Sequence, residues 1–554
     1  DDSPPSSASY LVHQCCLVEE MRAIFWDCYA ILHGFILLSS SQLACDQIAW
    51  PSTVVDCVDD CCSGPFGGNR TCRFRNLYWY GGAFRALLPH GSQYADKNQM
   101  RLWLLAPPVT SRNGEHVSRT LPAWSPEIVL VDSETDRQKL FREVCASNYN
   151  FNHIPSVSLL FSRFYPLNSA HAIFDDLYAP FLSLSKMGLD QSDFTPVIKS
   201  GHKSGYFVNL WGLRCPNCEE ETIARFARRP LLFESEFCPN CLMLFDELVA
   251  GSGFMGLETV NEFYEVPGYD RDAMWTFTRR MIYSFFGMQK PCAGSEAKEV
   301  SHYRDCISGS NSASPYRVHI VVVQNKRPEY PMELIVQNLR NRTAGVKVTY
   351  LKWKSYRRFE DMLRLVRDAD VYVTGVGSAS VWAVFMKPGG VVVNLGHRIH
   401  ARNSRNLTGV GFLEETLYAA TPYIKAMYFN DIEIRIPSVF SMVDQAVDAI
   451  YQRTSLVNRT RGDNLSPIGQ TFKLMCKLDR DGCKRILALW AGSAFPNVAE
   501  ERESCHVWSK AEWLIFGIWP WGDDPGFPCD YNRSAFEMAL AIQYGSASPP
   551  WGLR

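Results

Sequence analysis

The sequence predicts an α/β protein whose best-defined part is a doubly wound parallel sheet between residues 318 and 451. Two observations predict this class. Short β-branched runs alternate with segments whose apolar residues recur at helical spacing, and a glycine-rich turn joins the third run to the next helical segment. The composition, with 46% hydrophobic and 21% charged residues, is that of a globular protein and excludes disorder, collagen and coiled coil.

The elements follow one another in a regular order. Residues 318–323 form a β-branched run, interrupted only by His319, as expected for a strand buried on both faces. A helix follows, because its apolar residues share one face. The same reasoning gives the later elements. The expected strands are 318–323, 346–350, 371–373 and 391–393, and the expected helices carry apolar positions at 332–339, 359–366 and 379–386.

The first half of the chain shows a similar but less regular pattern. Strands are predicted at 128–131 and 157–161, with a helix at 137–145 between them. A second helix is expected from Asn168 toward Lys186, with Pro180 as the position where it would break. The flanking regions differ in composition. Residues 45–125 carry cysteines among Gly and Pro and predict a loop-rich, disulfide-tied region, and residues 453–554 predict a small Cys- and Trp-rich appendage that is also disulfide-tied.

Length and charge narrow the function classes. At about 150 residues per domain, 554 residues predict three to four domains. The chain has 56 basic and 58 acidic residues, for a net charge of -2. General nucleic-acid and membrane-surface binders carry an excess of Lys and Arg, so this balance argues against both classes.

Several features indicate a secretory route. The chain contains six Asn-x-Ser/Thr sequons, at Asn69, Asn341, Asn406, Asn458, Asn464 and Asn532, together with 19 cysteines, too few for a disulfide scaffold. From Met21 the sequence resembles a signal peptide, with small residues near a cut after Ser41 or Ala44. Residues 1–44 would then be an upstream extension and a signal peptide; a buried helix is the alternative. The apolar run is too short to span a bilayer, so no stable membrane span is expected in the mature chain.

Two segments carry candidate functional residues. The turn at residues 374–378 places Gly375 and Gly377 between a strand and a helix, where glycine permits close approach of a phosphate; backbone geometry alone is the alternative explanation. The second segment, residues 163–178, follows a strand. Its Asn168, His171 and Asp175 fall on one helix face after Arg163, as in a ligand site at the carboxyl end of a strand or a capped helix with a polar face.

The second segment resembles a known signature. Arg-aromatic-x-x-x-Asn-x-x-His-x-x-x-Asp-x-x-Tyr, residues 163–178, is similar to the N-lobe signature of glycosyltransferase family 61. That family includes plant β-1,2-xylosyltransferase, EGF-domain-specific O-GlcNAc transferase and protein O-mannose β-1,4-GlcNAc transferase. Residues 241–251 resemble its Cys-centred segment, and residues 369–392 resemble its C-lobe stretch. The three blocks occur in the family order and cover roughly residues 155–400.

The resemblance implies a GT-B fold, with two Rossmann-like lobes facing a cleft and disulfide-tied N- and C-terminal extensions. The N-terminal, acceptor-side lobe would be residues 126–310 and the nucleotide-sugar lobe residues 315–452. It further implies inverting transfer of GlcNAc or xylose from a UDP-sugar to a glycoprotein or glycan acceptor. The resemblance also implies that the reaction needs no cofactor. The protein would reside in the lumen of the endoplasmic reticulum or Golgi, or it would be secreted.

Inverting transfer needs a base for the acceptor hydroxyl and positive charge or amides for the leaving diphosphate. His171 and Asp175 fall on the N-lobe signature, and one or the other is the candidate for this catalytic base. Two departures from the family pattern are Val376, where the family usually has His, and Gln324, where an Arg is expected. The residues assigned to substrate and nucleotide are Arg163, Asn168, Lys326, Arg327, Gly375, Gly377 and Ser378.

A separate signal comes from two Cys-Pro-Asn-Cys motifs, Cys215 with Cys218 and Cys238 with Cys241. Their spacing suits a structural zinc ribbon in a reducing compartment. In an oxidising lumen two structural disulfides are expected instead. A redox-active Cys-x-x-Cys pair is the third interpretation. In each case the four cysteines belong to the N-terminal lobe.

Three hypotheses follow. The first is a lumenal inverting glycosyltransferase. The second is a catalytically inactive glycan- or protein-binding protein on the same fold, which Val376 favours. The third is a cytosolic zinc-ribbon protein that binds nucleic acid, which would require the signal peptide and all the sequons to be accidental and which the charge balance disfavours.

Overall fold

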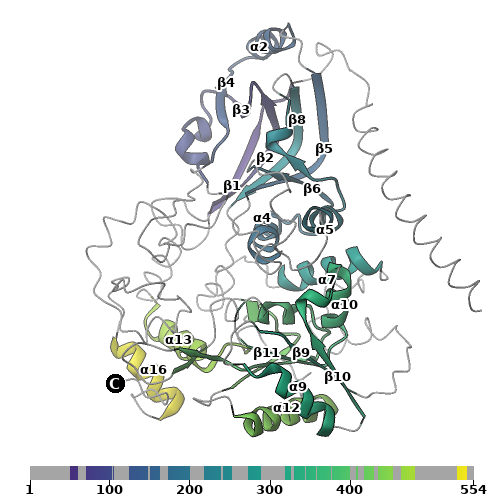
Figure 1. The fold of residues 1–554 in the computed structure, drawn as a ribbon. Coiled ribbons are helices and arrows are strands. Elements are labelled where there is room, and N and C mark those ends of the chain that lie inside the picture. The colour runs from purple at the N-terminus through teal and green to yellow at the C-terminus, as the bar shows by residue number, and fades with distance from the viewer. Residues whose placement is uncertain are drawn as a thin grey trace, which may run out of the picture.

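The computed structural model shows two large β-sheets with helices between them (Figure 1), and a two-stranded sheet of β13 (His397–Ile399) and β14 (Leu407–Gly409). It describes residues 50–59, 70–102, 104, 124–146, 150–162, 173–199, 218–238, 241–251, 273–287, 318–325, 330–342, 345–356, 358–375, 377, 379–399, 407–409, 417–418, 420–429, 435–452, 463–480 and 533–545.

The N-terminal sheet has eight strands in the order β4-β3-β2-β8-β5-β6-β7, with β1 also paired to β2. Strands β8, β5, β6 and β7 are parallel to one another, whereas β2 is antiparallel to β1, β3 and β8. The expected Rossmann-like pattern therefore describes only the parallel half of a mixed sheet. The strands are β1 (Val54–Asp59), β2 (Arg70–Tyr80), β3 (Ala83–Leu88), β4 (Glu127–Leu130), β5 (Asn150–Phe161), β6 (Phe194–Ile198), β7 (Leu232–Phe233) and β8 (Cys241–Gly251).

The expectation of a loop-rich region before residue 125 is wrong for residues 54–88, which form β1, β2 and β3. Gly81 and Gly82, both with positive φ (58° and 77°), make the two-residue turn between β2 and β3, and consecutive glycines with positive φ suit a hairpin whose twist matches its strands. The disulfide part of the expectation holds, because Cys57 and Cys72 are directly opposite on β1 and β2 and are bonded.

The C-terminal sheet confirms the predicted parallel sheet. Its order is β10-β9-β11-β12-β15, and every neighbouring pair is parallel. Helices α9 (Met332–Arg342) and α12 (Ile436–Tyr451) share a buried cluster with one face, and α10 (Phe359–Arg367) packs against the other. The strands are β9 (Val318–Val323), β10 (Val346–Leu351), β11 (Val371–Thr374), β12 (Val391–Asn394) and β15 (Lys425–Tyr428).

The helix expected at 379–386 is present in a different form. It is a 3₁₀ helix, η8, of six residues, Ser380–Phe385, and all six side chains are buried. A helix that is buried on all sides shows no amphipathic period, and Pro388 with Gly389 and Gly390 leaves little room for it to continue.

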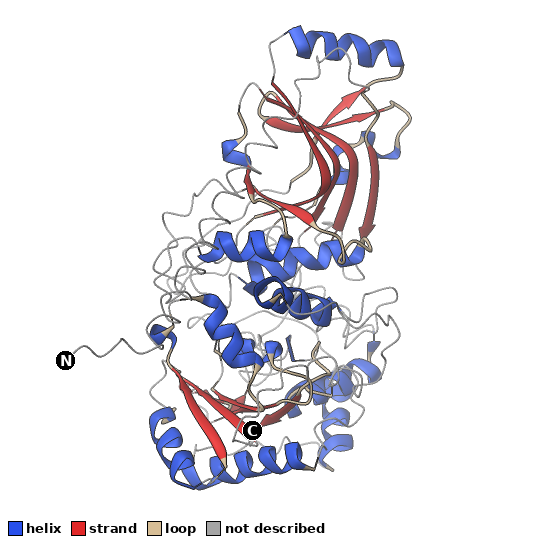
Figure 2. Ribbon diagram, turned by 90° about the vertical axis from the view of Figure 1, so that its right-hand side faces the viewer, coloured by secondary structure: helices blue, strands red, loops and turns tan. Residues whose placement is uncertain are grey.

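The two sheets share one hydrophobic core, which we name the inter-sheet core. Helices α4 (Ala179–Lys186), α5 (Cys218–Ala227) and α7 (Ala273–Phe286) lie between the sheets, as Figures 1 and 2 show. Phe277 on α7 is fully buried, 5.0 Å from Phe226 of α5 and 6.4 Å from Phe385 of η8 between ring centroids. The core thus joins the first half of the chain to the second.

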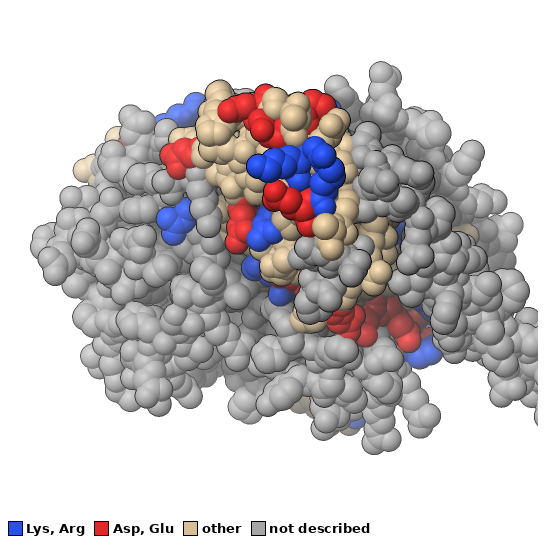
Figure 3. All heavy atoms as spheres, turned by 90° about the horizontal axis from the view of Figure 1, so that it is seen from above, with Lys and Arg blue, Asp and Glu red and all other residues tan. Residues whose placement is uncertain are grey.

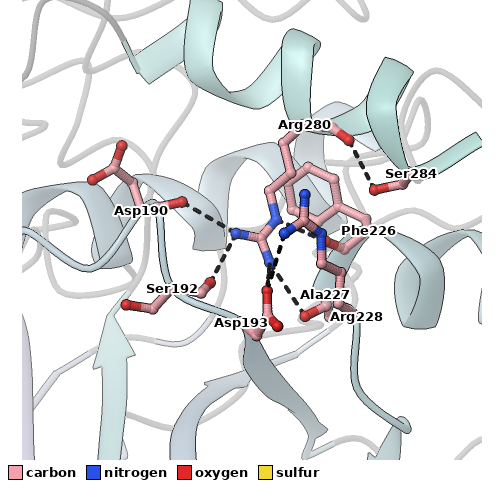
Figure 4. A network of polar contacts seen from close by, with 8 residues as sticks. All are labelled: Asp190, Ser192, Asp193, Phe226, Ala227, Arg228, Arg280 and Ser284. Atoms are coloured by element: carbon pink, nitrogen blue, oxygen red, sulfur yellow. Dashed lines mark hydrogen bonds and ion pairs between the residues drawn. The ribbon is translucent and has the colours of Figure 1, made fainter. Parts of the chain in front are cut away.

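Helix α7 is anchored by Arg280, whose side chain is 6% exposed (Figure 4). Its guanidinium donates to the carbonyl oxygens of Phe226 and Ala227 at the end of α5, at 2.7 and 3.2 Å. It also donates to Asp190 O and Ser192 O in the turn before β6, at 3.3 and 2.8 Å. Burial lowers the pKa of Arg280 to about 10, and the arginine ties α5, α7 and the α4–β6 turn together.

Candidate functional site

The carboxyl edge of the C-terminal sheet has the topology of a ligand site. From β9 the chain moves to one side to form β10 and later returns past β9 to form β11, so the strand order reverses between β9 and β11. Open parallel sheets bind ligands at such a point, outside the carboxyl ends of the strands. The loop after β9 and the turn after β11, which contains Gly375 and Gly377, meet there.

Gly375 is explained by close packing within the protein. A Cβ at this position would lie 2.6 Å from the ring of Tyr330 and 2.8 Å from Asn325 Nδ2, distances at which the neighbour would have to move. The Tyr330 hydroxyl donates to Gly396 O, so the ring spans from the β11 turn to the residues after β12. Asn325, Tyr330 and Gly375 therefore converge at the point where the strand order reverses.

Gly377 has a backbone reason for being glycine. Its φ of 107° lies in the region that side chains disfavour. Its carbonyl accepts from both Ser380 N, at 2.9 Å, and Ser380 Oγ, at 2.7 Å, which fixes the entry into η8. Both alternatives for this turn, backbone geometry and ligand approach, therefore still apply: backbone geometry accounts for Gly377 and close packing against Tyr330 and Asn325 for Gly375.

Asn394, at the end of β12, is fully buried beside Thr374 of β11. Its Oδ1 accepts from Gly396 N at 3.0 Å, while its Nδ2 has no hydrogen-bond partner among the described residues. An unpaired buried donor costs about 1–3 kcal/mol, so this edge of the sheet holds a donor that a water molecule or a polar ligand group would stabilise.

The structure packs part of the 163–178 segment against η8, the helix that follows the β11 turn. Residues 174–178 form a π-helical turn directly before α4. Phe174 lies 5.9 Å from Phe385 of η8 between ring centroids, so the two sequence blocks meet in the inter-sheet core. Pro180 lies in the first turn of α4, where a missing N–H is tolerated. The helix therefore continues past Pro180, and the irregular turn precedes it. Such π-turns are frequent at functional sites.

Most predicted site residues cannot be placed. Arg163, Asn168, His171, Lys326, Arg327, Ser378 and Cys215 lie outside the described residues, as do Val376 and residues 1–49 with the signal-like segment. Asp175 lies in the π-helical turn, but its side chain is outside the described part. Gly375 and Gly377 directly precede η8, and the π-helical turn that contains Asp175 packs against η8. The other assignments stay predictions.

The structure adds Glu234, a carboxylate that the sequence did not single out. It follows β7, and Lys199 follows β6, so both lie at the carboxyl edge of the parallel half of the N-terminal sheet. Lys199 Nζ lies 3.4 Å from Glu234 Oε1. Burial raises the pKa of Glu234, and Lys199 opposes this in part. From the sequence, Glu234 could have been found only by its position directly after β7. A strand of two residues is too short to be predicted from an apolar pattern.

One Cys-Pro-Asn-Cys motif is resolved in favour of a disulfide, since Cys238 is bonded to Cys241. Cys218 begins α5, with its side chain outside the described part. Among the described residues, no three His, Cys, Asp or Glu side chains gather as metal ligands would.

The surface around α2 (Glu134–Ala146) is mixed in charge. Lys and Arg side chains are interspersed with Asp and Glu on this face (Figure 3). That pattern agrees with the balanced composition and offers no continuous basic surface there. Within the described ranges, no helix has the length and apolar character needed to cross a bilayer.

Comparison with known proteins identifies distant relatives. The chain is 22% identical over 412 residues to protein O-linked-mannose beta-1,4-N-acetylglucosaminyltransferase 2 of Xenopus tropicalis, which covers 69% of this chain and 62% of the relative. The proteins of the same name from Bos taurus and Mus musculus are 23% and 24% identical, each over 60% of this chain and 51% of the relative. The chain is related to glycosyltransferases. No model of a known protein family matches it.

The chain spans between half and two thirds of the length of the curated glycosyltransferases it matches. The relationship agrees with the resemblance read from residues 155–400. At 22–24% identity the similarity links the chain to glycosyltransferases in general, and its donor, acceptor and catalytic residues belong to the proposal below.

Proposed function

We propose that this chain is an inverting glycosyltransferase of the secretory pathway that transfers GlcNAc or xylose from a UDP-sugar to a protein or glycan acceptor. The observation that carries the proposal is the similarity to GlcNAc-transferases over 60–69% of the chain. The reversal of strand order between β9 and β11, with its glycine-rich turn, supports it. The two-lobed GT-B arrangement, with the nucleotide sugar between the lobes, is part of this proposal.

The proposed division of labour follows the chemistry. The donor diphosphate binds near Gly375, Gly377 and Ser378, with Lys326 and Arg327 supplying positive charge as it departs. His171 or Asp175 removes the proton from the acceptor hydroxyl, and Arg163 and Asn168 orient the substrates. Direct attack by that hydroxyl inverts the anomeric carbon. No metal is required by this scheme, because the leaving diphosphate is stabilised by side chains.

A second candidate is an inactive binding protein on the same fold. Two observations favour it: Val376 stands where the family usually has His, and the ring of Tyr330 already fills the space beside Gly375. The two candidates share a fold and differ in whether a nucleotide binds productively, so one experiment separates them.

The deciding experiment combines thermal shift with a transfer assay. UDP and UDP-sugars are added to the purified chain at about 100 times the dissociation constant, where a ligand adds about 2.7 kcal/mol. We expect a shift with UDP and with one UDP-sugar. Combined replacement of Lys326 and Arg327 by Ala should abolish it, whereas Lys347→Ala, at an exposed position on β10, should not. No shift with any nucleotide would favour the binding protein.

A transfer assay on single variants then tests which residue acts as the base for the acceptor hydroxyl. His171→Ala and Asp175→Asn should each lower turnover about 100-fold or more, with the UDP shift retained. Glu234→Gln is compared with Glu236→Gln, an exposed residue of the same short helix, η6 (Glu234–Glu236). Loss in Glu234→Gln alone would move the base to that carboxylate, and full turnover in the His171 and Asp175 variants would show their assignment to be wrong.

A further inference from the structure

Two sequons lie where the structure describes the asparagine, and the fold treats them differently. Asn341 belongs to Asn341-Arg342-Thr343 and Asn464 to Asn464-Leu465-Ser466. Asn341 is exposed, whereas Asn464 is 1% exposed. Both satisfy the Asn-x-Ser/Thr rule, although Asn341 has Thr343 and Asn464 has Ser466 followed by Pro467, and the fold places the two asparagines in different surroundings.

Asn341 lies in the last turn of α9. Because α9 connects the parallel strands β9 and β10, it begins at the carboxyl edge of the sheet and ends at the amino edge. A group attached to Asn341 would therefore project from the edge opposite the Gly375 turn. A glycan there is compatible with the folded chain and leaves the carboxyl edge open.

Asn464 is part of the sheet's hydrogen bonding. Its Nδ2 donates to Thr421 O at 2.7 Å and to Ile424 O at 2.9 Å, and its Oδ1 accepts from Ala426 N at 2.9 Å. In the strand order of the described residues β15 stands at the edge of the sheet, and the Ala426 N–H points away from β12. The amide of Asn464 thus takes the place of a neighbouring strand.

We propose that Asn341 carries an N-linked glycan and that Asn464 does not, although both are sequons. This inference rests on the secretory route in the proposed function. In the reaction the host transferase joins the asparagine Nδ2 to C1 of GlcNAc from a lipid-linked diphosphate oligosaccharide. The C1–O bond to the diphosphate breaks, the amide loses one proton, and the lipid diphosphate leaves. At Asn464 the lost N–H is one that the fold uses, and the buried site has no room for a sugar.

The test is a map of glycan occupancy on the full chain secreted from eukaryotic cells. An amidase that releases N-glycans in H₂¹⁸O converts each occupied asparagine to ¹⁸O-labelled aspartate, which peptide mass spectrometry locates. We expect the label at position 341 and unmodified asparagine at position 464. Label at position 464 in folded protein, or none at position 341, overturns the proposal.

Two matched variants test independently which sequon carries a glycan, because each removes one sequon by an Asn→Gln change. Asn341→Gln should lower the mass of the secreted protein by one glycan and leave its melting temperature unchanged. Asn464→Gln should leave the glycan mass unchanged and lower the melting temperature by several degrees. The reverse pattern contradicts the proposal. If Asn464→Gln does not fold, the occupancy map of the unaltered chain still decides.

The outcome is separable from that of the proposed function. Occupancy does not depend on nucleotide binding or transfer, so a glycan at Asn341 in an inactive protein supports this inference alone. Absence of glycan from every sequon overturns it together with the secretory assignment. A glycan at Asn464 overturns this inference and leaves the secretory assignment in place.

Discussion

Among the described residues, His319 is a partly buried histidine whose protonation the fold disfavours. It interrupts the apolar run of β9, and its Nε2 lies 2.9 Å from Thr349 Oγ1 on β10. Burial and then Lys347 lower its pKa, and Lys387 acts in the same direction. The Asp368 backbone and the Asp370 carboxylate oppose the shift in part. The neutral imidazole is therefore the form that the fold accommodates.

The sign of the pH effect follows. Since the pKa of His319 is lower in the folded state, the unfolded chain binds more protons as the pH falls below about 6.5. This contribution to the free energy of unfolding is complete above that pH and declines below it. His319→Gln should reduce the difference in stability between about pH 7.5 and pH 5, measured by urea denaturation. His90→Gln, at an exposed position, is the control, and an unchanged difference in His319→Gln would refute the role.

Single residues also show what the sequence could and could not predict. The glycines at 375 and 377 were found from their position after an apolar run, but their causes were not. Gly375 makes room for Tyr330, and Gly377 has a positive φ. Asn464 shows the reverse case, because its sequon indicates a surface site and its contacts bury it. A side chain's partners depend on tertiary packing, which a local pattern does not contain.

At the scale of elements, Arg280 determines how firmly α7 is held. Replacement by Leu would leave the carbonyl oxygens of Phe226, Ala227, Asp190 and Ser192 without these donors. We expect Arg280→Leu to lower the free energy of unfolding by about 2–4 kcal/mol, measured by chemical denaturation. Arg228→Gln serves as a control, because Arg228 is half exposed and its ion pair with Asp193 should contribute about 1 kcal/mol or less. Equal losses in both variants would contradict the anchoring role.

Elements with a clear period were predicted well. The strands β9, β10, β11 and β12 and helices α9 and α10 lie where the apolar runs and stripes indicated. Burial of one helix face imposes a helical period, and burial of both faces of a central strand gives a continuous apolar run. Elements without such a period were missed or changed type. The 3₁₀ helix η8 is buried all round, the π-helical turn precedes Pro180, and β1 to β3 lie in a segment that its Gly and Pro content made look irregular.

At the scale of the whole molecule, the inter-sheet core makes the two halves depend on each other. Phe277 packs against residues of both, including Tyr178 and Phe385. The sequence placed each half correctly in the α/β class but gave no signal for this shared core. Contacts between distant segments leave no local period, and the N-terminal sheet pairs strands far apart in the chain, such as β2 with β8.

The shared core predicts one cooperative unfolding transition. Calorimetry on the full chain should show a single heat-absorption peak, and Phe277→Ala should shift that peak to lower temperature without dividing it, with a loss of about 3–5 kcal/mol for a buried aromatic. Two resolved peaks in the unaltered chain, or a variant that lowers only one of them, would show that the halves unfold separately.

The disulfide between Cys57 and Cys72 determines whether a proteolytic cut between these two residues can be detected on a gel. It links neighbouring strands at directly opposite positions and encloses the 14 residues implied by their separation of 15. A protease that cut within that loop would leave both pieces joined, by the bond and by the β1–β2 ladder. The nick would therefore escape detection on a denaturing gel until a reductant was added. In a reducing compartment the piece before the cut would lose this covalent link and keep its noncovalent contacts, among them the β1–β2 ladder and the hydrogen bond from the Tyr78 hydroxyl to Pro51 O.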